Sequence, residues 1–368
     1  MARLHDWVEL SKSTIHSLKL SDATRFYETE WPETRRMLIA DHADAIEAER
    51  KRLRRFVRTR SAELYGLAKR LAPLRRVVFL VAFVWFFLLL VGIASKDIGV
   101  RGWPLFEIAA CFMLMVVLLA MELIDKIKYR DELELARDLQ SDLIPKNPAQ
   151  TPEYEIAAFN EIANTVGGDI YDFVPLSDGR LAVLFGDASG HGMAAGLVMA
   201  VAHAAFRTQL DVDPSPAAIV TSLNRILCRT GGPRSFFAFC YVLLSPNGDF
   251  NAVTAGHPEI LKIDPNGKVI ERVGTGSYPL GIKSGLSWPA IRGSLGSGQK
   301  LLFHSDGLTE AHNRLGREFG DAYVEAVVSW NPGGSPSSLV QTLADEFHAF
   351  SAGHLPEDDV SIAVVMRK

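Results

Sequence analysis

Residues 166–192, VGGDIYDFVPLSDGRLAVLFGDASGHG, place two apolar runs on either side of a short polar turn. The turn, Ser177-Asp178-Gly179, has the length of a three-residue hairpin loop and ends on the glycine that a left-handed backbone conformation favours. Asp169 and Asp187 each lie nine residues from Asp178, on opposite sides of it. The stretch therefore predicts a β-hairpin whose open end carries both carboxylates, roughly opposite each other and about 5 Å apart.

The glycines around these two aspartates allow two interpretations. They form either a backbone cradle for a phosphate or a compact loop around a metal-binding carboxylate. A bare carboxylate repels a phosphate, and two neighbouring carboxylates repel each other until one takes up a proton. A bound divalent cation removes both conflicts. We therefore predict a cation near Asp169 and Asp187, approached by backbone carbonyls of the glycine-rich turns.

A second pair of aspartates comes from distant parts of the sequence. Asp306 follows an expected strand, residues 300–304, and Asp358 precedes another, residues 360–366. If these strands are antiparallel neighbours, Asp306 and Asp358 share one end of a sheet, but the sequence leaves open whether the first pair lies at that end. Four strand-end aspartates in a region without a cluster of Cys and His favour Mg²⁺ or Mn²⁺ over zinc.

The region from residue 154 onward consists of short β-rich runs separated by Gly, Pro, Asn and Asp. The expected strands are residues 154–159, 169–176, 180–186, 236–244, 251–255, 259–263, 268–273, 300–304 and 360–366. The expected helices are residues 191–210, 215–230 and 335–351. Strands in hairpins, interrupted by only three helices, favour a sandwich of antiparallel sheets over a regularly alternating parallel fold.

Composition limits the class of protein. The 368 residues provide for about two domains, and 48% hydrophobic content excludes a disordered chain. The net charge of −4 and the clustering of the basic residues do not suggest a nucleic-acid binder. The three cysteines lack metal-ligand spacing, which excludes a C-x-x-C zinc site, and they cannot form a disulfide framework, as expected in a reducing compartment.

Two apolar runs, residues 77–94 and 105–124, predict a transmembrane helical hairpin, with buried core helices as the alternative. No cleavable signal peptide is apparent in the first twenty residues. Basic residues flank the pair on its outer sides: Arg70, Arg75 and Arg76 before it, and Lys126, Lys128 and Arg130 after it. By the positive-inside rule, the chain crosses the cytoplasmic (inner) membrane twice and keeps both flanking regions in the cytoplasm.

The segments on either side of the predicted spans are helical by pattern. Residues 1–76 form a cytosolic region whose basic block, residues 50–60, either attracts anionic membrane lipid or is a solvated helix face. Residues 125–147 form an amphipathic linker in which Leu135, Leu139 and Leu143 are four residues apart. This helix is either the seam of a homodimer or a helix packed on its own domain.

Five blocks in order, VGGDIYDF, FGDASGHGMAAGLVMA, AGHPEILKID, LLFHSDGLTEAHNRLGREFG and PEDDVSIAVV, give the chain a family resemblance. From about residue 135 onward it resembles the bacterial sporulation-and-stress branch of the metal-dependent protein phosphatases (SpoIIE/RsbU type, PPM superfamily). The resemblance implies an α+β fold over residues 150–368, an αββα sandwich of antiparallel sheets with flanking helices. It also implies hydrolysis of serine/threonine phosphoproteins with two Mn²⁺ or Mg²⁺ ions.

The resemblance also assigns roles to residues. Asp187 would bridge both metals, the carbonyl of Ala188 would be a further ligand, Asp169 would serve one metal, and Asp306 and Asp358 the other. Asp359 is expected in a turn or behind the ligands. His191 either donates a proton to the leaving serine oxygen or caps the helix that it begins. His257 and His304 are expected to be structural residues near the site.

The expected substrate, by resemblance, is a small phosphorylated regulatory protein of the anti-sigma-factor antagonist type. One departure concerns substrate binding, because family members often carry a basic residue before the VGGD motif, whereas residues 160–165 read NEIANT. The rival hypothesis is a catalytically silent module that uses the fold to hold a partner at the membrane. A nucleotide kinase or cyclase is disfavoured because the chain has no GxxxxGK[ST] pattern.

Overall fold

The computed structural model describes residues 52–71, 73–94, 104–163, 165–232, 235–274, 276–351, 356 and 358–368. Most of the helical region predicted before residue 76, including the start of its basic block, lies outside the described residues. The chain divides into two compact units, residues 1–127 and residues 128–368. A single long helix, α7 (Pro104–Ser141), contributes residues to both.

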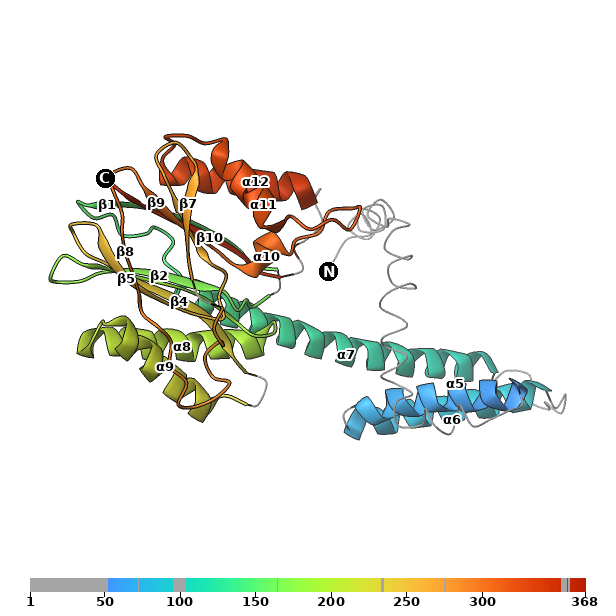
Figure 1. The fold of residues 1–368 in the computed structure, drawn as a ribbon. Helices are drawn as coiled ribbons and strands as arrows, with labels where there is room; N and C mark the ends of the chain where they lie inside the picture. The colour runs from blue at the N-terminus through green and yellow to red at the C-terminus, as the bar shows by residue number, and fades with distance from the viewer. Residues whose placement is uncertain are drawn as a thin grey trace, which may run out of the picture. The chain divides into compact units, whose positions relative to one another are not determined.

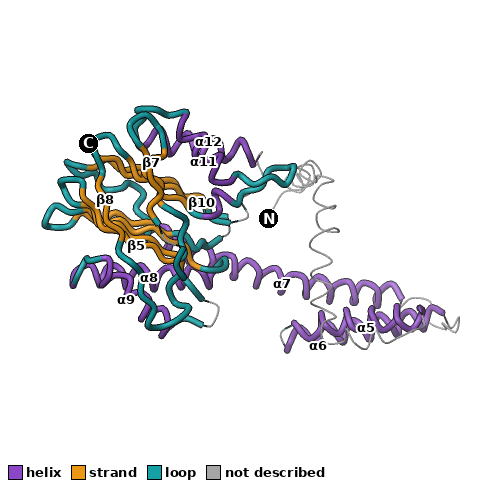
Figure 2. The backbone as a smooth tube through the Cα atoms, in the orientation of Figure 1, coloured by secondary structure: helices purple, strands orange, loops and turns teal. Residues whose placement is uncertain are grey.

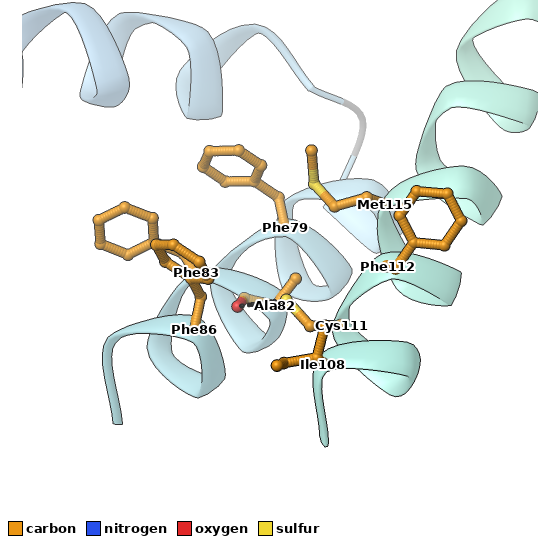
Figure 3. Close-up of a pocket in the computed structure, with 8 residues that line it drawn as sticks. All are labelled: Phe79, Ala82, Phe83, Phe86, Ile108, Cys111, Phe112 and Met115. Atoms are coloured by element: carbon orange, nitrogen blue, oxygen red, sulfur yellow. Dashed lines mark hydrogen bonds between the residues drawn. The ribbon is translucent and has the colours of Figure 1, made fainter. Parts of the chain in front are cut away.

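The first unit consists of α5 (Arg52–Arg70), α6 (Pro73–Ala94) and the first part of α7. α6 and α7 run antiparallel: Arg75 Nη1 lies 3.1 Å from Glu122 Oε2, and Cys111 Sγ lies 3.8 Å from the carbonyl oxygen of Ala82. Between the two helices is an apolar cavity of about 440 Å³. Figure 3 shows the side chains around it, which are Phe79, Ala82, Phe83, Phe86, Ile108, Cys111, Phe112 and Met115.

One helix among the described residues is long and apolar enough to cross a membrane, the segment Ile108–Ser141 of α7. It contains most of the second predicted span. The first predicted span, residues 77–94, is helical as part of α6. The pairing of the two as a transmembrane hairpin, and its orientation, stay predictions.

The linker prediction needs a small correction at its end. α7 continues without interruption from the apolar segment into the amphipathic one and ends at Ser141, whereas the linker helix was expected over residues 125–147. Pro145 explains the earlier end, because proline lacks the N–H group that would bond to the carbonyl of Ser141.

The second unit contains two five-stranded antiparallel sheets (Figure 1). The first has the order β1-β10-β9-β6-β7, with β1 (Tyr154–Glu161), β6 (Ile260–Ile263), β7 (Val269–Val273), β9 (Lys300–His304) and β10 (Val360–Arg367). The second has the order β2-β3-β4-β5-β8, with β2 (Ile170–Pro175), β3 (Leu181–Ala188), β4 (Phe237–Leu244), β5 (Asp249–Ala255) and β8 (Ile291–Ser294).

Helices cover the outer face of each sheet, as Figures 1 and 2 show. α8 (Met193–Val212) and α9 (Pro216–Thr230) pack on the second sheet, and α12 (Pro336–Ser351) packs on the first, with α11 (Gly320–Ser329) beside it. The inner faces meet in an apolar core in which the rings of Phe185 and Phe303, one from each sheet, stack at 6.0 Å. The predicted α+β sandwich of antiparallel sheets is thus confirmed.

Three short elements were not predicted: β8, α10 (Asp306–Thr309) and α11. The expectation of only three helices in this region was therefore wrong. Val324, Val327 and Val328 of α11 are buried with the three- and four-residue spacing of a helix face, but β-branched residues weaken the helical signal in sequence. β8 is an edge strand of four residues, IRGS, with a single large apolar side chain.

Candidate metal site

The hairpin formed by β2 and β3 brings the first two aspartates together as predicted. Its register pairs Ile170 with Gly186, so Asp169 and Asp187 are the next residues opposite each other. The N–H of Ala188 donates a hydrogen bond of 3.2 Å to the carbonyl of Gly168, which continues the pairing by one residue. The loop closes at Gly179, whose φ of 83° is in the left-handed region.

Asp169 is the most deeply buried acid of the site, with 2% of its surface exposed. Burial raises its pKa well above the usual value, and the charges of Asp187 and Asp359 raise it further. Its Oδ2 atom is buried and has no hydrogen-bond partner among the described residues. A buried carboxylate oxygen without a partner is costly, and a bound cation would satisfy it.

The second pair reaches the same end of the sandwich, which the sequence had left open. β9 and β10 are antiparallel neighbours with His304 opposite Ile362, so Asp306 and Asp358 both lie beyond that end of the pair. The pKa of Asp187 is raised to about 8, first by burial and then by the charges of Asp306, Asp358 and Asp359. Carboxylates from both sheets therefore act on one another at a single acidic end.

The Asp359 side chain holds backbone groups of the loop that precedes Asp169. Its carboxylate accepts hydrogen bonds from the backbone N–H of Ala163 (2.8 Å) and of Gly168 (2.6 Å). A Cβ atom on Gly167 would lie 2.3 Å from the same carboxylate. Asp359 thus fixes the loop that leads into Asp169, and glycine is required where the loop passes it.

The linker helix also holds this loop, which sequence reasoning missed. Gln140 of α7 donates from Nε2 to the carbonyl of Gly167 (2.7 Å) and accepts at Oε1 from the N–H of the same residue (2.9 Å). The Gln140 side chain is only 4% exposed. A polar residue on the apolar side of an amphipathic helix was the available signal. Through it, the last turn of α7 contacts a residue two positions before Asp169.

The three histidines occupy different environments. His191 is exposed and precedes Gly192, the N-cap of α8, so the cap position itself belongs to glycine. Burial raises the pKa of Asp358, and the charge of His191 opposes that rise, so the imidazole is within electrostatic range of this carboxylate. His257 and His304 are buried, and the His257 ring lies edge-on to Phe185 at 5.2 Å. Both therefore lie in the packed interior.

These residues fit a hard divalent cation, although in the described part of the chain no three of the acidic, histidine or cysteine side chains converge on one point. Carboxylates of like charge repel one another when no cation lies between them. The oxygen donors, the unpartnered Oδ2 of Asp169 and the tight turn all suit Mg²⁺ or Mn²⁺. A Cβ atom on Gly168 would lie 2.7 Å from the carbonyl oxygen of Ala188, so the close contact between the backbones of these two residues requires glycine at position 168.

Residues 177–368, just over half of the chain, match the model of the family described as Stage II sporulation protein E (SpoIIE). The chain belongs to the SpoIIE family. Among curated relatives, phosphoserine phosphatase RsbU of Bacillus subtilis is 22% identical over 241 residues, which cover 65% of this chain and 71% of RsbU. Phosphoserine phosphatase RsbP of the same organism is 24% identical over 190 residues, covering 50% of this chain and 47% of RsbP.

Protein IcfG of Synechocystis is 23% identical over 278 residues, or 68% of this chain and 43% of IcfG. The chain thus spans less than half the length of IcfG and of RsbP. Solved structures agree on the fold of this SpoIIE-family member. The SiaA-PP2C domain of Pseudomonas aeruginosa matches with a TM-score of 0.58 at 18% identity, covering 66% of this chain and 98% of that domain. A structure of SpoIIE from Bacillus subtilis matches with a TM-score of 0.53 at 18% identity, covering 59% and 64%.

Proposed function

We propose that this protein is a metal-dependent serine/threonine phosphoprotein phosphatase. The observation that carries the proposal is the acidic end of the sandwich, where four aspartates from two sheets act on one another and a buried oxygen of Asp169 has no hydrogen-bond partner in the described part of the chain. Membership of the SpoIIE family, with relatives named phosphoserine phosphatases, supports the reaction class.

Two Mn²⁺ or Mg²⁺ ions are the proposed cofactors. Asp187 would contact both ions, and the carbonyl of Ala188 would be a further ligand. Asp169 would hold one ion, and Asp306 and Asp358 the other. When bound, such a metal pair supplies a hydroxide nucleophile at neutral pH and offsets the charge of the phosphate. The chain's own contribution is position, because Asp359 and Gln140 fix the loop before Asp169 by backbone hydrogen bonds.

His191 is the proposed proton donor to the leaving serine oxygen. Its exposure leaves it accessible to a substrate, and its effect on the pKa of Asp358 supports a location beside the reacting group. A general acid of this kind contributes most when the leaving group is a poor one, such as a serine alkoxide.

The substrate that the family relationship suggests is a small phosphorylated regulatory protein of the anti-sigma-factor antagonist type. The apolar segment of α7 supports a location at the inner membrane, surrounded by lipid. A two-pass arrangement with the acidic site in the cytoplasm is consistent with the basic residues on both flanks of the predicted spans.

The linker helix is the proposed route of regulation. Leu135 and Leu139 are 61% and 64% exposed and one turn apart on α7, so they leave an apolar edge that a second copy of the helix could cover. Gln140 of the same turn is hydrogen-bonded to Gly167. A shift of α7 in a homodimer would therefore move the loop that carries Asp169. Leu139→Glu should lower both the dimer fraction and the activity, and no change in either would refute this route.

Phosphate release from a phosphoserine protein tests the enzymatic function. The full-length protein should release phosphate with Mn²⁺ and stop doing so after EDTA treatment, and Asp187→Ala should be inactive while remaining folded by circular dichroism. Asp178→Ala, in the turn at the far end of the same hairpin, is the matched control and should keep its activity. Binding of Mn²⁺ without phosphate release from any phosphoprotein would instead support the silent binding module.

A further inference from the structure

The segment between α10 and α11 forms an ordered hairpin next to the acidic end. We name residues 311–319 the rim hairpin. At its base the N–H of Phe319 donates to the carbonyl of Ala311 (2.8 Å), and further out the N–H of Asn313 donates to the carbonyl of Arg317 (2.9 Å). Figure 2 draws the segment as loop, so its order comes from these contacts and not from a regular element.

The rim hairpin is fixed at its base and at its tip. Phe319 is 3% exposed, and its ring packs edge-on to Tyr323 at 4.6 Å and to Phe350 at 5.2 Å. At the tip the Asn313 side chain accepts hydrogen bonds from the N–H groups of Leu315 (2.9 Å) and Arg317 (3.1 Å). A preorganised loop loses little conformational entropy when it binds a partner.

Its position places it at the edge of the proposed site. Asp306 begins α10, and the N–H of Glu310 donates to the carbonyl of Asp306 (2.8 Å), so the hairpin starts one turn after a proposed metal ligand. Four residues separate Ala311 from Leu315, which limits the tip to about 13 Å from the base. A protein whose phosphate is bound at the acidic end extends beyond it and can contact this tip, whereas p-nitrophenyl phosphate has no aliphatic or acidic side chain to offer to it.

The tip combines an apolar side chain with positive charge. Leu315 is 81% exposed, and both Arg314 and Arg317 are exposed as well. Arg317 has no carboxylate within ion-pair distance among the residues that the structure describes. Residues 160–165, which precede the VGGD motif, contain no basic residue. Positive charge is thus available at the tip of the hairpin, which begins one turn after Asp306.

We propose that the rim hairpin is a docking element for the phosphoprotein substrate, an inference that rests on the proposed function. Leu315 contacts an apolar side chain of the substrate, and Arg314 and Arg317 contact acidic groups near its phosphoserine. A phosphoserine carries about −1.5 to −2 charges at neutral pH, and acidic residues that flank it in a substrate add to this charge. Arginines at the rim complement that charge and favour acidic substrates over basic ones.

The test compares two phosphoserine peptides and one small phosphate on the full-length protein with Mn²⁺. One 15-residue peptide carries Leu and Glu around the phosphoserine, the second carries Ser and Lys at those positions, and p-nitrophenyl phosphate is the small substrate. Arg317→Glu should lower kcat/KM for the acidic peptide roughly tenfold through KM, as expected for a charge that steers association. Leu315→Ala should lower it by up to about tenfold. Hydrolysis of p-nitrophenyl phosphate should stay unchanged in both variants, which also controls for folding.

Two matched controls lie far from the site. Val212→Ala removes an apolar side chain that is 77% exposed at the end of α8, about 30 Å along the helix from its start beside the site. Arg292→Glu makes the same charge change on β8. Arg292 is paired with Asn251 of β5, which lies at the end of the second sheet opposite to the acidic end. Both controls should behave as wild type.

Three outcomes would overturn the proposal. The first is unchanged kcat/KM for the acidic peptide in both hairpin variants, and the second is an equal loss in the matched controls. Either of these would leave the phosphatase function intact, because the wild type would still hydrolyse all three substrates. The third is a wild type that hydrolyses none of them, which would overturn the proposed function and the docking role together.

Discussion

Replacing Asp187 by asparagine should stabilise the metal-free protein while it abolishes phosphate release. Burial and the neighbouring carboxylates raise the pKa of Asp187 from 3.8 to about 8. Each pKa unit corresponds to about 1.4 kcal/mol, and about three units separate the unfolded-state value from pH 7. Folding the metal-free wild type at pH 7 therefore costs up to about 4 kcal/mol at this one group. Asparagine has nearly the same shape and carries no charge, so it removes this cost.

The sign of the pH dependence provides a second check on the same variant. Because the folded-state pKa of Asp187 lies above its unfolded-state value, the stability that this group contributes is fully present below pH 3.8. That contribution is lost as the pH rises towards 8. The wild type without metal should thus lose stability over this range, and Asp187→Asn should lose less of it.

Thermal unfolding of the full-length protein measures both effects. If Asp187→Asn recovers half of that cost, the gain of about 2 kcal/mol in the free energy of unfolding corresponds to a rise in Tm of roughly 4–8 °C for a unit of this size. In EDTA, Asp187→Asn should melt above wild type, and Mn²⁺ should raise the Tm of the wild type much more than that of the variant. Asp178→Asn is the control, because Arg180 lowers the pKa of Asp178 and its loss should not stabilise the protein. A lower Tm for Asp187→Asn in EDTA would refute the reasoning.

Three further predictions follow from the site and its surroundings. Gln140→Leu removes both hydrogen bonds to Gly167 and should weaken Mn²⁺ binding about tenfold, as measured by titration, because groups that hold the ligand loop also orient the ligands. Arg137→Gln, at an exposed position of the same turn and outside the proposed dimer seam, should bind Mn²⁺ normally, and equal affinity in the wild type and both variants would contradict the role of Gln140. His191→Asn should lower kcat on phosphoserine peptides by about a hundredfold and leave p-nitrophenyl phosphate hydrolysis nearly unchanged, because only the alkoxide leaving group needs a proton; equal losses on both substrates would exclude a proton donor. Burial lowers the pKa of His257 to about 4, so its contribution to stability is present above pH 6.5 and lost as the pH falls towards 4. In His257→Phe, the free energy of unfolding measured with denaturant should therefore vary less with pH over that range, and a pH profile equal to that of the wild type would refute this contribution of His257.

The local parts of this fold were predictable and the non-local parts were not. The hairpin around Gly179 is determined by its own turn residues and by two apolar runs, so Asp169 and Asp187 could be paired from sequence alone. Asp169 and Asp187 lie at the same end of the sandwich as Asp306 and Asp358 because of how the two sheets pack. The sequences of the individual strand pairs do not specify that packing. Sequence patterns specify pairing within a sheet more directly than packing between sheets.

The loop before Asp169 was missed for a related reason. Gln140 is 27 residues from Gly167, and nothing in the linker pattern indicates which backbone group its amide contacts. Asp359 forms its hydrogen bonds to Ala163 and Gly168 across more than 190 residues. Such long-range contacts to backbone atoms can be identified only once the fold is known. The proposed ligand aspartates, in contrast, have glycines beside them in the sequence.

The most direct test of the central claim is phosphate release from a phosphoserine protein by the full-length chain, measured with and without Mn²⁺. The account predicts that phosphate release requires Mn²⁺ and stops when EDTA is added. It also predicts that Asp187→Ala releases no phosphate although the variant is folded. Release that continues in EDTA, or that survives in Asp187→Ala, would contradict it.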